Sequence, residues 1–177
     1  MSHLLPRSRS RSLLREQNGA AVTATVAESI WLPIRDADPR GFGHYMRHYS
    51  SKKARAGREH KRWQFNGRRY IGNGEHLSLL TVDGTAHFAW RWQKFRKDEQ
   101  TGIECCIFRN EGPHLSSDLI READSVAWER WPGVRHFTFV DPAEIRSTNP
   151  GYCFLMAGWT RLEKRSKSGK VVLELML

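Results

Sequence analysis

The sequence predicts one mixed α/β (α+β) domain in which helices flank a central sheet. Three observations support this fold class. The chain has 177 residues, of which 39% are hydrophobic and seven are tryptophan, and this is enough to build a core. Its middle has the pattern of a β-hairpin. Its last third alternates between strand and helix patterns, and no internal repeat interrupts that order.

The N-terminal part divides into a tail and the beginning of the domain. Within residues 1–20, Arg7–Ser12 repeats two residue types without apolar periodicity, so we expect a basic, flexible tail. The domain then covers residues 21–177. A segment rich in Val, Thr and Ile predicts a first strand over residues 21–34, which ends at Pro33. Residues 36–51 predict a mixed helix or turn.

The clearest local pattern is a hairpin in the middle of the chain. Two apolar runs, residues 77–82 and 86–90, flank Asp83-Gly84, which is a favoured tight-turn dipeptide. Residues 103–108 then read as a mostly buried strand. The centre of the chain therefore contributes three consecutive strands to the predicted sheet.

A helix and another strand follow this group. Residues 116–131 place their apolar side chains at helical spacings, and Pro132-Gly133 ends the pattern. Residues 135–140 predict a strand, which stops at Asp141-Pro142. The order along the chain is therefore a meander of strands followed by strand, helix and strand.

The last elements are a short helix and a second hairpin. We predict Asn149 as the N-cap of this helix, Pro150 at its first position and Gly158 as the residue that closes it. Residues 159–162 and 170–175 predict the final hairpin.

Net charge is the strongest bulk signal for function. The chain carries +10 at pH 7, which favours polyanionic partners, nucleic acid first and anionic membrane second. Eight Lys or Arg residues lie between Lys52 and Arg69 against one acid, Glu59, and aromatic residues are interleaved with them. Basic and aromatic residues together suit phosphate contact and base stacking. The alternative is a solvated basic loop with a few core aromatics.

Several classes of protein are disfavoured by the sequence. No apolar run approaches the roughly 20 residues that a membrane span needs, and Met1–Arg15 lacks the apolar core of a secretion signal. Of the three cysteines, Cys105 and Cys106 are adjacent, so neither a disulfide framework nor zinc-finger spacing is present. We expect a reducing, cytosolic setting without a membrane partner.

A loop and a short helix in the last third have motifs that resemble those of the Gcn5-related N-acetyltransferases. The resemblance to this family in the order of elements covers roughly residues 22–175. Arg109–His114 occupies the place of the family's phosphate-binding turn, Gln/Arg-x-x-Gly-x-Gly/Ala, although Pro113 and His114 depart from that pattern. The resemblance implies a mixed, mostly antiparallel sheet and acetyl-CoA as cofactor. The cofactor-binding residues that it implies are Arg109, Gly112, His114, Leu115, Ser116, Ser117 and Asn149.

The short helix carries the second part of the resemblance. Tyr152 stands where many family members have a tyrosine that protonates the departing CoA thiolate, and Asn149 resembles the asparagine that contacts the pantetheine arm. Gly158-Trp159 is similar to the Gly-aromatic pair that closes this helix. Each residue also has an ordinary structural interpretation, as an N-cap, a packed tyrosine and a C-cap.

A narrower resemblance is to the Mom DNA-modification proteins of bacteriophages. It rests on His48-Tyr49-Ser50 ahead of the hairpin, Arg109 before the turn, Asp141 after the next strand and Tyr152 on the following helix. The resemblance implies that the chain adds a carbamoylmethyl or acyl-derived group to N6 of adenine in double-stranded DNA, which protects it from restriction. The implied setting is the cytoplasm of a bacterial host.

The resemblance also assigns roles. The catalytic candidates are His48 as base, Asp141 as its orienting partner or as the base itself, Tyr152 as acid, and Tyr49 beside them. A metal ion, with iron as one choice, would have His48 and Asp141 as its candidate ligands. The residues assigned to DNA contact are Ser50, Lys52, Lys53, Arg55, Arg58, Lys61, Arg62 and Trp63.

Two other functions stay open on the sequence alone. A conventional acetyl-CoA-dependent N-acetyltransferase would act on an amine of a protein, an RNA or a small molecule without DNA. A catalytically inactive domain of the same fold would only bind nucleic acid, and the unusual Pro113-His114 pair favours that choice. A homodimer is a candidate assembly for each of them.

Overall fold

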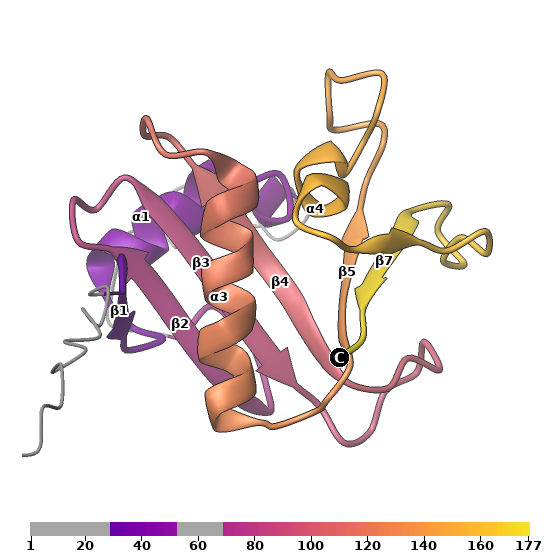
Figure 1. The fold of residues 1–177 in the computed structure, drawn as a ribbon, viewed down its shortest axis with the longest axis horizontal. Helices are drawn as coiled ribbons and strands as arrows, with labels where there is room; N and C mark the ends of the chain where they lie inside the picture. Colours follow the sequence, from indigo (N-terminus) through magenta and orange to yellow (C-terminus); the bar gives the residue numbers. More distant parts are fainter. Residues whose placement is uncertain (1–28, 53–68) are drawn as a thin grey trace, which may run out of the picture.

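A computed structural model describes residues 29–52 and 69–177, which form one seven-stranded sheet with helices on both faces (Figure 1). The strand order is β1-β2-β3-β4-β5-β7-β6. Neighbouring strands are antiparallel except β4 and β5, which run parallel. The strands are β1 (Trp31–Ile34), β2 (Glu75–Thr81), β3 (Ala86–Trp92), β4 (Ile103–Asn110), β5 (His136–Val140), β6 (Thr160–Arg161) and β7 (Val171–Leu175). The mixed α+β class with a mostly antiparallel sheet is confirmed.

The helices place one core on each face of the sheet. In the described residues they are α1 (Pro39–Arg47), α3 (Ser116–Arg130) and α4 (Tyr152–Met156). The larger core packs α3 and α4 against one face, and a smaller one, which includes Tyr45 of α1, covers part of the other (Figure 1). In these segments, no helix has both the length and the apolar composition that crossing a membrane requires.

The central hairpin and the long helix match their predictions. Strands β2 and β3 pair in the register Leu79↔Phe88, and the backbone N–H of Gly84 donates to the Thr81 carbonyl at 2.8 Å. Gly84 has a φ of 73°, which glycine adopts without strain. Helix α3 buries Leu119, Ile120, Ala123 and Ala127 on its inner face. Local patterns were sufficient here because α3 has an apolar face and the hairpin joins two apolar runs by a tight-turn dipeptide.

The first strand is shorter than predicted. Strand β1 begins at Trp31 and continues through Pro33 to Ile34, and the N-terminal part of the predicted segment, like the predicted tail over residues 1–20, lies outside the described residues. Pro33 faces Leu79 of β2. Proline is tolerated here because β1 is the edge strand of the sheet and has a partner on one side alone.

The predicted N-cap of the short helix, Asn149, is wrong. Helix α4 begins at Tyr152, and its N-cap is Gly151, whose φ is 83°. Asn149 and Pro150 both precede this N-cap, and the Asn149 side chain accepts a hydrogen bond from Arg161 at 2.5 Å. The predicted end is confirmed: Gly158 follows the C-cap with a φ of 99°, and the Trp159 N–H donates to the Phe154 carbonyl at 3.0 Å.

Candidate active site

Strands β4 and β5 diverge halfway along their length (Figure 1). They pair from Ile103↔His136 to Cys105↔Thr138, although β4 continues to Asn110. The register between β3 and β4 shifts so that β4 carries one extra residue, Cys106. A bulge of this kind bends a strand and increases its twist. The bulge therefore accounts for the way β4 turns away from β5.

A cavity of about 240 Å³ occupies the gap between the two strands. Four residues singled out from the sequence line it: His48 and Tyr49, which follow α1, and Asn149 and Tyr152, at the beginning of α4. These two pairs are far apart in the chain and come from opposite faces of the sheet. The gap in the sheet brings them to one place.

His48 presents a neutral ring to this cavity. Its side chain is almost enclosed, with 8% of the residue exposed. Burial, and then the nearby charge of Arg109, lower the pKa of His48 to about 4. Nδ1 lies 3.2 Å from the backbone N–H of Ser50 and 2.8 Å from its hydroxyl, an arrangement that favours the neutral tautomer with the proton on Nε2. His48 thus offers a hydrogen-bond donor, whereas the base predicted from the sequence needs a free lone pair.

Tyr49 spans the gap between the diverging strands. Its hydroxyl donates to the carbonyl of Phe139 at 3.3 Å, and Phe139 directly follows the last β5 residue that pairs with β4. The ring also packs against His48, with 4.3 Å between the ring centroids. Burial raises the pKa of Tyr49 to about 12. The phenol therefore stays protonated at neutral pH and replaces β4 as the partner of that carbonyl.

Asp141 lies beside Tyr49 but is not among the described residues that line the cavity. Its carboxylate accepts a hydrogen bond from the Ala143 N–H at 3.1 Å, within the turn after β5. Burial is the largest cause of the raised pKa of Tyr49. The backbone N–H of Asp141 lowers this pKa by hydrogen bonding to the phenol oxygen, and the negative carboxylate of Asp141 raises it. The structure therefore places Asp141 next to the phenol of Tyr49 rather than next to a ligand in the cavity.

Tyr152 is the most accessible of the predicted catalytic residues. It is the first residue of α4 and is 53% exposed while it lines the cavity. Its backbone N–H donates to the Asn149 carbonyl at 3.1 Å. Gly151 sets its position, because a Cβ there would lie 2.8 Å from Leu173 Cδ1. This close approach to β7 holds the start of α4 against the sheet and directs Tyr152 to the cavity.

Arg109 is engaged on the α1 side of the sheet. Its Nη1 donates to the carbonyl of Arg47 at 2.8 Å, and its Nε pairs with Glu111. Arg47 donates two further hydrogen bonds of 2.7 Å to the same carboxylate. The pairing with Arg47, then with Arg109, lowers the pKa of Glu111 to about 2. Arg109 therefore acts on His48 and Glu111 rather than on the first turn of α3.

Two residues of the predicted phosphate turn face the β2–β3 loop. A Cβ on Gly112 would lie 2.0 Å from Thr85 Oγ1, so the close approach of Thr85 requires glycine there. The His114 side chain turns to the same loop, where its Nε2 lies 2.9 Å from Asp83 Oδ2. The sequence predicted both as cofactor contacts, and the structure gives both a role in joining the two loops.

The first turn of α3 fits a phosphate group. Its N-cap, Leu115, is 65% exposed, and no side chain caps the helix. Asn110 donates to Ser116 Oγ at 3.1 Å, which leaves the Ser116 hydroxyl hydrogen available to a ligand, while Ser117 is buried. Uncapped backbone N–H groups and the helix dipole attract phosphate. The same half of α3 contacts α4, since Arg121 donates to the Met156 carbonyl at 2.6 Å.

The described residues contain no ready-made metal centre. In the two described segments, no group of three or more His, Cys, Asp or Glu side chains gathers in a metal-binding arrangement. Nδ1 of His48 is occupied by Ser50, and Asp141 faces its own turn. A metal ion held by His48 and Asp141 stays a prediction.

The basic run predicted to contact DNA begins at Lys52. Its Nζ pairs with Glu144 in the β5–α4 loop, and 58% of its side chain is exposed. Ser50, also exposed, bonds to His48. The remaining predicted contacts lie outside the described residues: Lys53, Arg55, Arg58, Lys61, Arg62 and Trp63. Contact with DNA by this run stays a prediction.

Sequence reasoning missed the cysteines of this site. All three cysteines of the chain, Cys105, Cys106 and Cys153, line the cavity. Burial raises the pKa of each, to about 12 for Cys106, so the side chains are thiols at neutral pH. Cys106 Sγ donates to the Ala89 carbonyl at 3.3 Å, across the bulge. Two adjacent small apolar residues within a strand were the available signal.

Comparison with known proteins does not assign a family. No protein-family model matches the chain, and neither a curated protein nor a solved structure shows a significant match to it. The features that bear on function are the divergence of β4 and β5 and the side chains that line the cavity between them.

Proposed function

We propose that this chain is an acyl-CoA-dependent transferase with the architecture of the Gcn5-related acetyltransferases, and that it modifies N6 of adenine in DNA as the phage Mom proteins do. One observation carries the proposal. The bulge at Cys106 opens a cavity between β4 and β5 that His48, Tyr49 and Tyr152 line together. The net charge of +10 favours a polyanionic substrate.

Acetyl-CoA would be held at two places, the first turn of α3 and the gap between β4 and β5. The pyrophosphate would lie on the backbone N–H groups and the Ser116 hydroxyl at the first turn of α3. The pantetheine arm would then extend into the gap, past Phe108 and Phe154, whose rings lie 5.9 Å apart. When it is bound, this cofactor supplies an acyl group activated as a thioester.

The chain's own residues would orient the acceptor and handle one proton. The exocyclic amine of adenine is a weak nucleophile, so orientation and exclusion of water matter as much as deprotonation. The Nε2–H of His48 suits an acceptor nitrogen of the base. The phenol of Tyr152 is accessible and lines the cavity at the start of α4, where it can give a proton to a leaving group.

An adenine inside a duplex must leave the stack to reach this site. Enzymes that act on bases pay a few kcal/mol to extrude them and then hold them between aromatic side chains. Tyr49, Phe139 and Tyr152 line the cavity and provide such surfaces. The cavity volume of about 240 Å³ accommodates a single base or the end of the cofactor arm, so a pair of ligands has to meet at its mouth.

The direct test is mass spectrometry of nucleosides from plasmid DNA recovered from cells that express the chain. The wild type should yield a deoxyadenosine adduct that carries an acyl-derived group in place of one hydrogen. Direct transfer from the thioester gives an acetyl group and frees CoA as its thiol, whereas a carbamoylmethyl group requires a separate donor of the amide nitrogen, and its mass distinguishes the two. Tyr152→Phe should yield neither adduct. Unmodified DNA from cells with confirmed expression would contradict the proposal.

Two further measurements separate the alternatives if the adduct is absent. Turnover of acetyl-CoA without DNA would indicate a conventional acetyltransferase with an amine acceptor on a protein, an RNA or a small molecule. Salt-sensitive DNA binding without CoA binding would indicate an inactive binding domain.

A further inference from the structure

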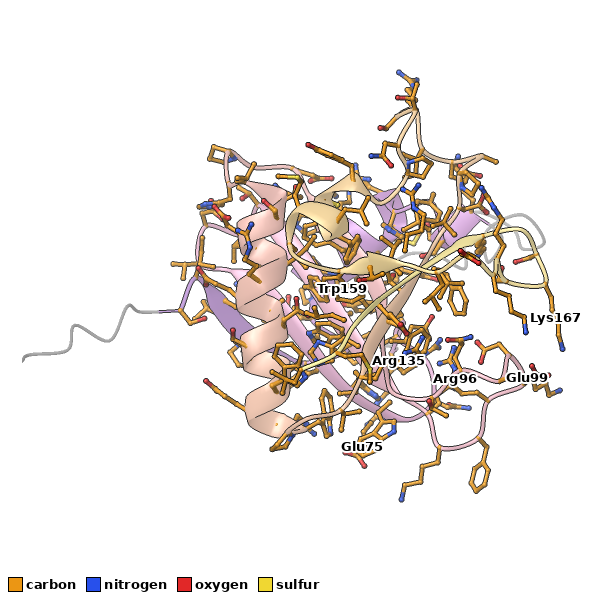
Figure 2. The ribbon with its side chains drawn as sticks, turned by 45° about the vertical axis from the view of Figure 1, so that its right-hand side comes forward. Glu75, Arg96, Glu99, Arg135, Trp159 and Lys167 are labelled. Atoms are coloured by element: carbon orange, nitrogen blue, oxygen red, sulfur yellow. The ribbon has the colours of Figure 1, made fainter. Side chains whose placement is uncertain are left out.

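A second concave region lies between the β3–β4 loop and the β6–β7 loop. We call it the basic groove; its walls are residues 91–104 and residues 162–172, and its volume is about 550 Å³. Figure 2 shows the two walls, with Arg96 and Glu99 on one and Lys167 at the tip of the other. Nothing in the sequence patterns marked these loops, since the basic run that drew attention lies at residues 52–69.

The basic groove has an excess of positive charge. Seven basic and three acidic residues line it. The acidic residues are all taken up by ion pairs inside the groove, which are Arg91–Glu104, Arg96–Glu104, Arg96–Asp98 and Lys167–Glu99.

Four basic residues are left for a ligand: Lys97 on one wall and Lys164, Arg165 and Lys170 on the other. In the described part of the chain, none of them pairs with a carboxylate. Cations that face one another across a concave surface concentrate the potential within it. A chain of phosphate groups therefore suits the basic groove better than a single carboxylate does.

The floor of the basic groove is rigid. The Arg96 side chain is 6% exposed and its guanidinium lies 4.9 Å from the centroid of the Phe137 ring. Arg135 covers the same ring at 5.1 Å. Strand β7 is paired with β5 beneath these contacts. The loops that carry the unpaired cations are thus anchored at their bases.

The basic groove adjoins the cavity between β4 and β5 at Phe139, which lines both. Tyr49 donates to the carbonyl of this same residue. A nucleic acid strand in the groove would therefore have a base within reach of the cavity.

We propose that the basic groove binds the phosphate backbone of the DNA strand whose base enters the cavity. That the bound strand is the substrate rests on the proposed function. Concavity favours nucleic acid over a lipid surface, because a flat bilayer cannot reach cations that face each other inside a groove. Phe95, on the β3–β4 loop and 94% exposed, adds an aromatic ring that can stack on a base.

Two charge-reversal variants with equal net charge test this inference. The groove variant combines Lys97→Glu and Lys164→Glu, one exposed residue from each wall. The control combines Arg35→Glu and Arg130→Glu, two exposed residues away from the groove, the first directly after β1 at the far edge of the sheet and the second at the end of α3. Fluorescence anisotropy with a labelled DNA duplex and with the same strand single, over a series of salt concentrations, measures the affinity of the full-length proteins.

We expect the groove variant to bind DNA at least about tenfold more weakly and to lower the slope of log K against log salt by about 2, because two phosphate contacts are lost. The control should change both quantities much less. An equal loss in both variants would show that net charge alone attracts DNA and would overturn the inference, as would no loss in either. Tighter binding to phosphatidylserine vesicles than to DNA would also overturn it.

Failure of the inference is distinct from failure of the proposed function. Wild-type DNA adducts together with unchanged binding by the groove variant would refute the groove and keep the function. Selective loss of binding in the groove variant, with no adduct from the wild type, would keep the groove and refute the function.

Discussion

The two ends of the β4–β5 pair form opposite environments, and each contains a histidine. Where the strands are paired, His136 is fully buried, and its ring lies 4.5 Å from the rings of Trp90 and Trp128. Its Nδ1 donates to Asp124 at 2.7 Å. Where the strands diverge, His48 lines a cavity and faces it with a neutral ring.

The comparison separates a histidine that builds the fold from one that is available for chemistry. A carboxylate holds His136, and Trp159 donates to the other oxygen of Asp124 at 2.9 Å, so every partner of this group is part of the core. His48 is tied down by the Ser50 backbone at one nitrogen alone. The bulge at Cys106 lies at the boundary between the two environments. Residues near the paired end should therefore control stability, and residues at the open end should control activity.

The largest expected effect is at the paired end. Asp124→Ala leaves the N–H groups of His136 and Trp159 without a partner inside the core, and we expect the free energy of unfolding to fall by about 3 to 5 kcal/mol. Urea denaturation measures it. Glu129→Ala, an exposed position on the same helix, is the matched control and should change stability by less than about 0.5 kcal/mol. A loss below about 1 kcal/mol for Asp124→Ala would break the comparison.

The pH dependence of stability should report the buried state of His48. The pKa of this group falls from 6.5 to about 4 on folding, so between these values the unfolded chain binds a proton that the folded chain does not. Stability therefore decreases as the pH falls through this window, with about 3 kcal/mol attributable to His48. His48→Gln should flatten the decrease by that amount. The decrease should not disappear, because burial also lowers the pKa of His87, to about 3. Identical pH profiles for the wild type and the variant would show that His48 does not titrate as described.

A smaller effect is expected for the phenol that spans the gap. Tyr49→Phe removes the donor to the Phe139 carbonyl, and the free energy of unfolding should fall by about 1 kcal/mol. Chemical denaturation at pH 7 would detect it. A stability equal to that of the wild type would mean that water replaces the hydroxyl at no cost.

The smallest expected change in stability accompanies a complete loss of activity. Tyr152→Phe alters an exposed hydroxyl at the start of α4, so stability should stay within about 0.5 kcal/mol of the wild type. DNA modification should nevertheless be abolished. Unchanged modification by this variant would remove Tyr152 from the mechanism. Because Tyr→Phe is made at both Tyr49 and Tyr152, comparing the two variants distinguishes an effect on stability from an effect on activity.

The parts of the fold that follow from local patterns could be predicted from the sequence. The apolar runs around Asp83-Gly84 and the helical spacing from Leu119 to Ala127 are properties of short segments, and both elements form where expected. The capping of α4 could not be predicted, because the helix begins after Gly151, whose position depends on its close approach to Leu173 on a later strand.

The sequence pointed to residues that line the candidate site, but it did not predict the contacts that each of them makes. Neighbouring motifs pointed to His48, Tyr49 and Tyr152, and the structure brings the three together. The proton position on His48 depends on the conformation of the Ser50 backbone, and the environment of Arg109 depends on Arg47 and Glu111. Such contacts are set by tertiary structure, which a motif does not encode.

The most direct test of the central claim, that the gap between β4 and β5 is the cofactor site, uses two adjacent exposed residues of the β5–α4 loop. Ser147 lines the cavity and Thr148 does not. Isothermal titration of acetyl-CoA into the wild type, Ser147→Trp and Thr148→Trp compares a blocked cavity with a matched substitution beside it. We expect the wild type and Thr148→Trp to bind with the same affinity and Ser147→Trp to bind at least about tenfold more weakly, since an indole fills much of a cavity of this size. Equal binding by all three proteins, or no binding by the wild type, would contradict the account.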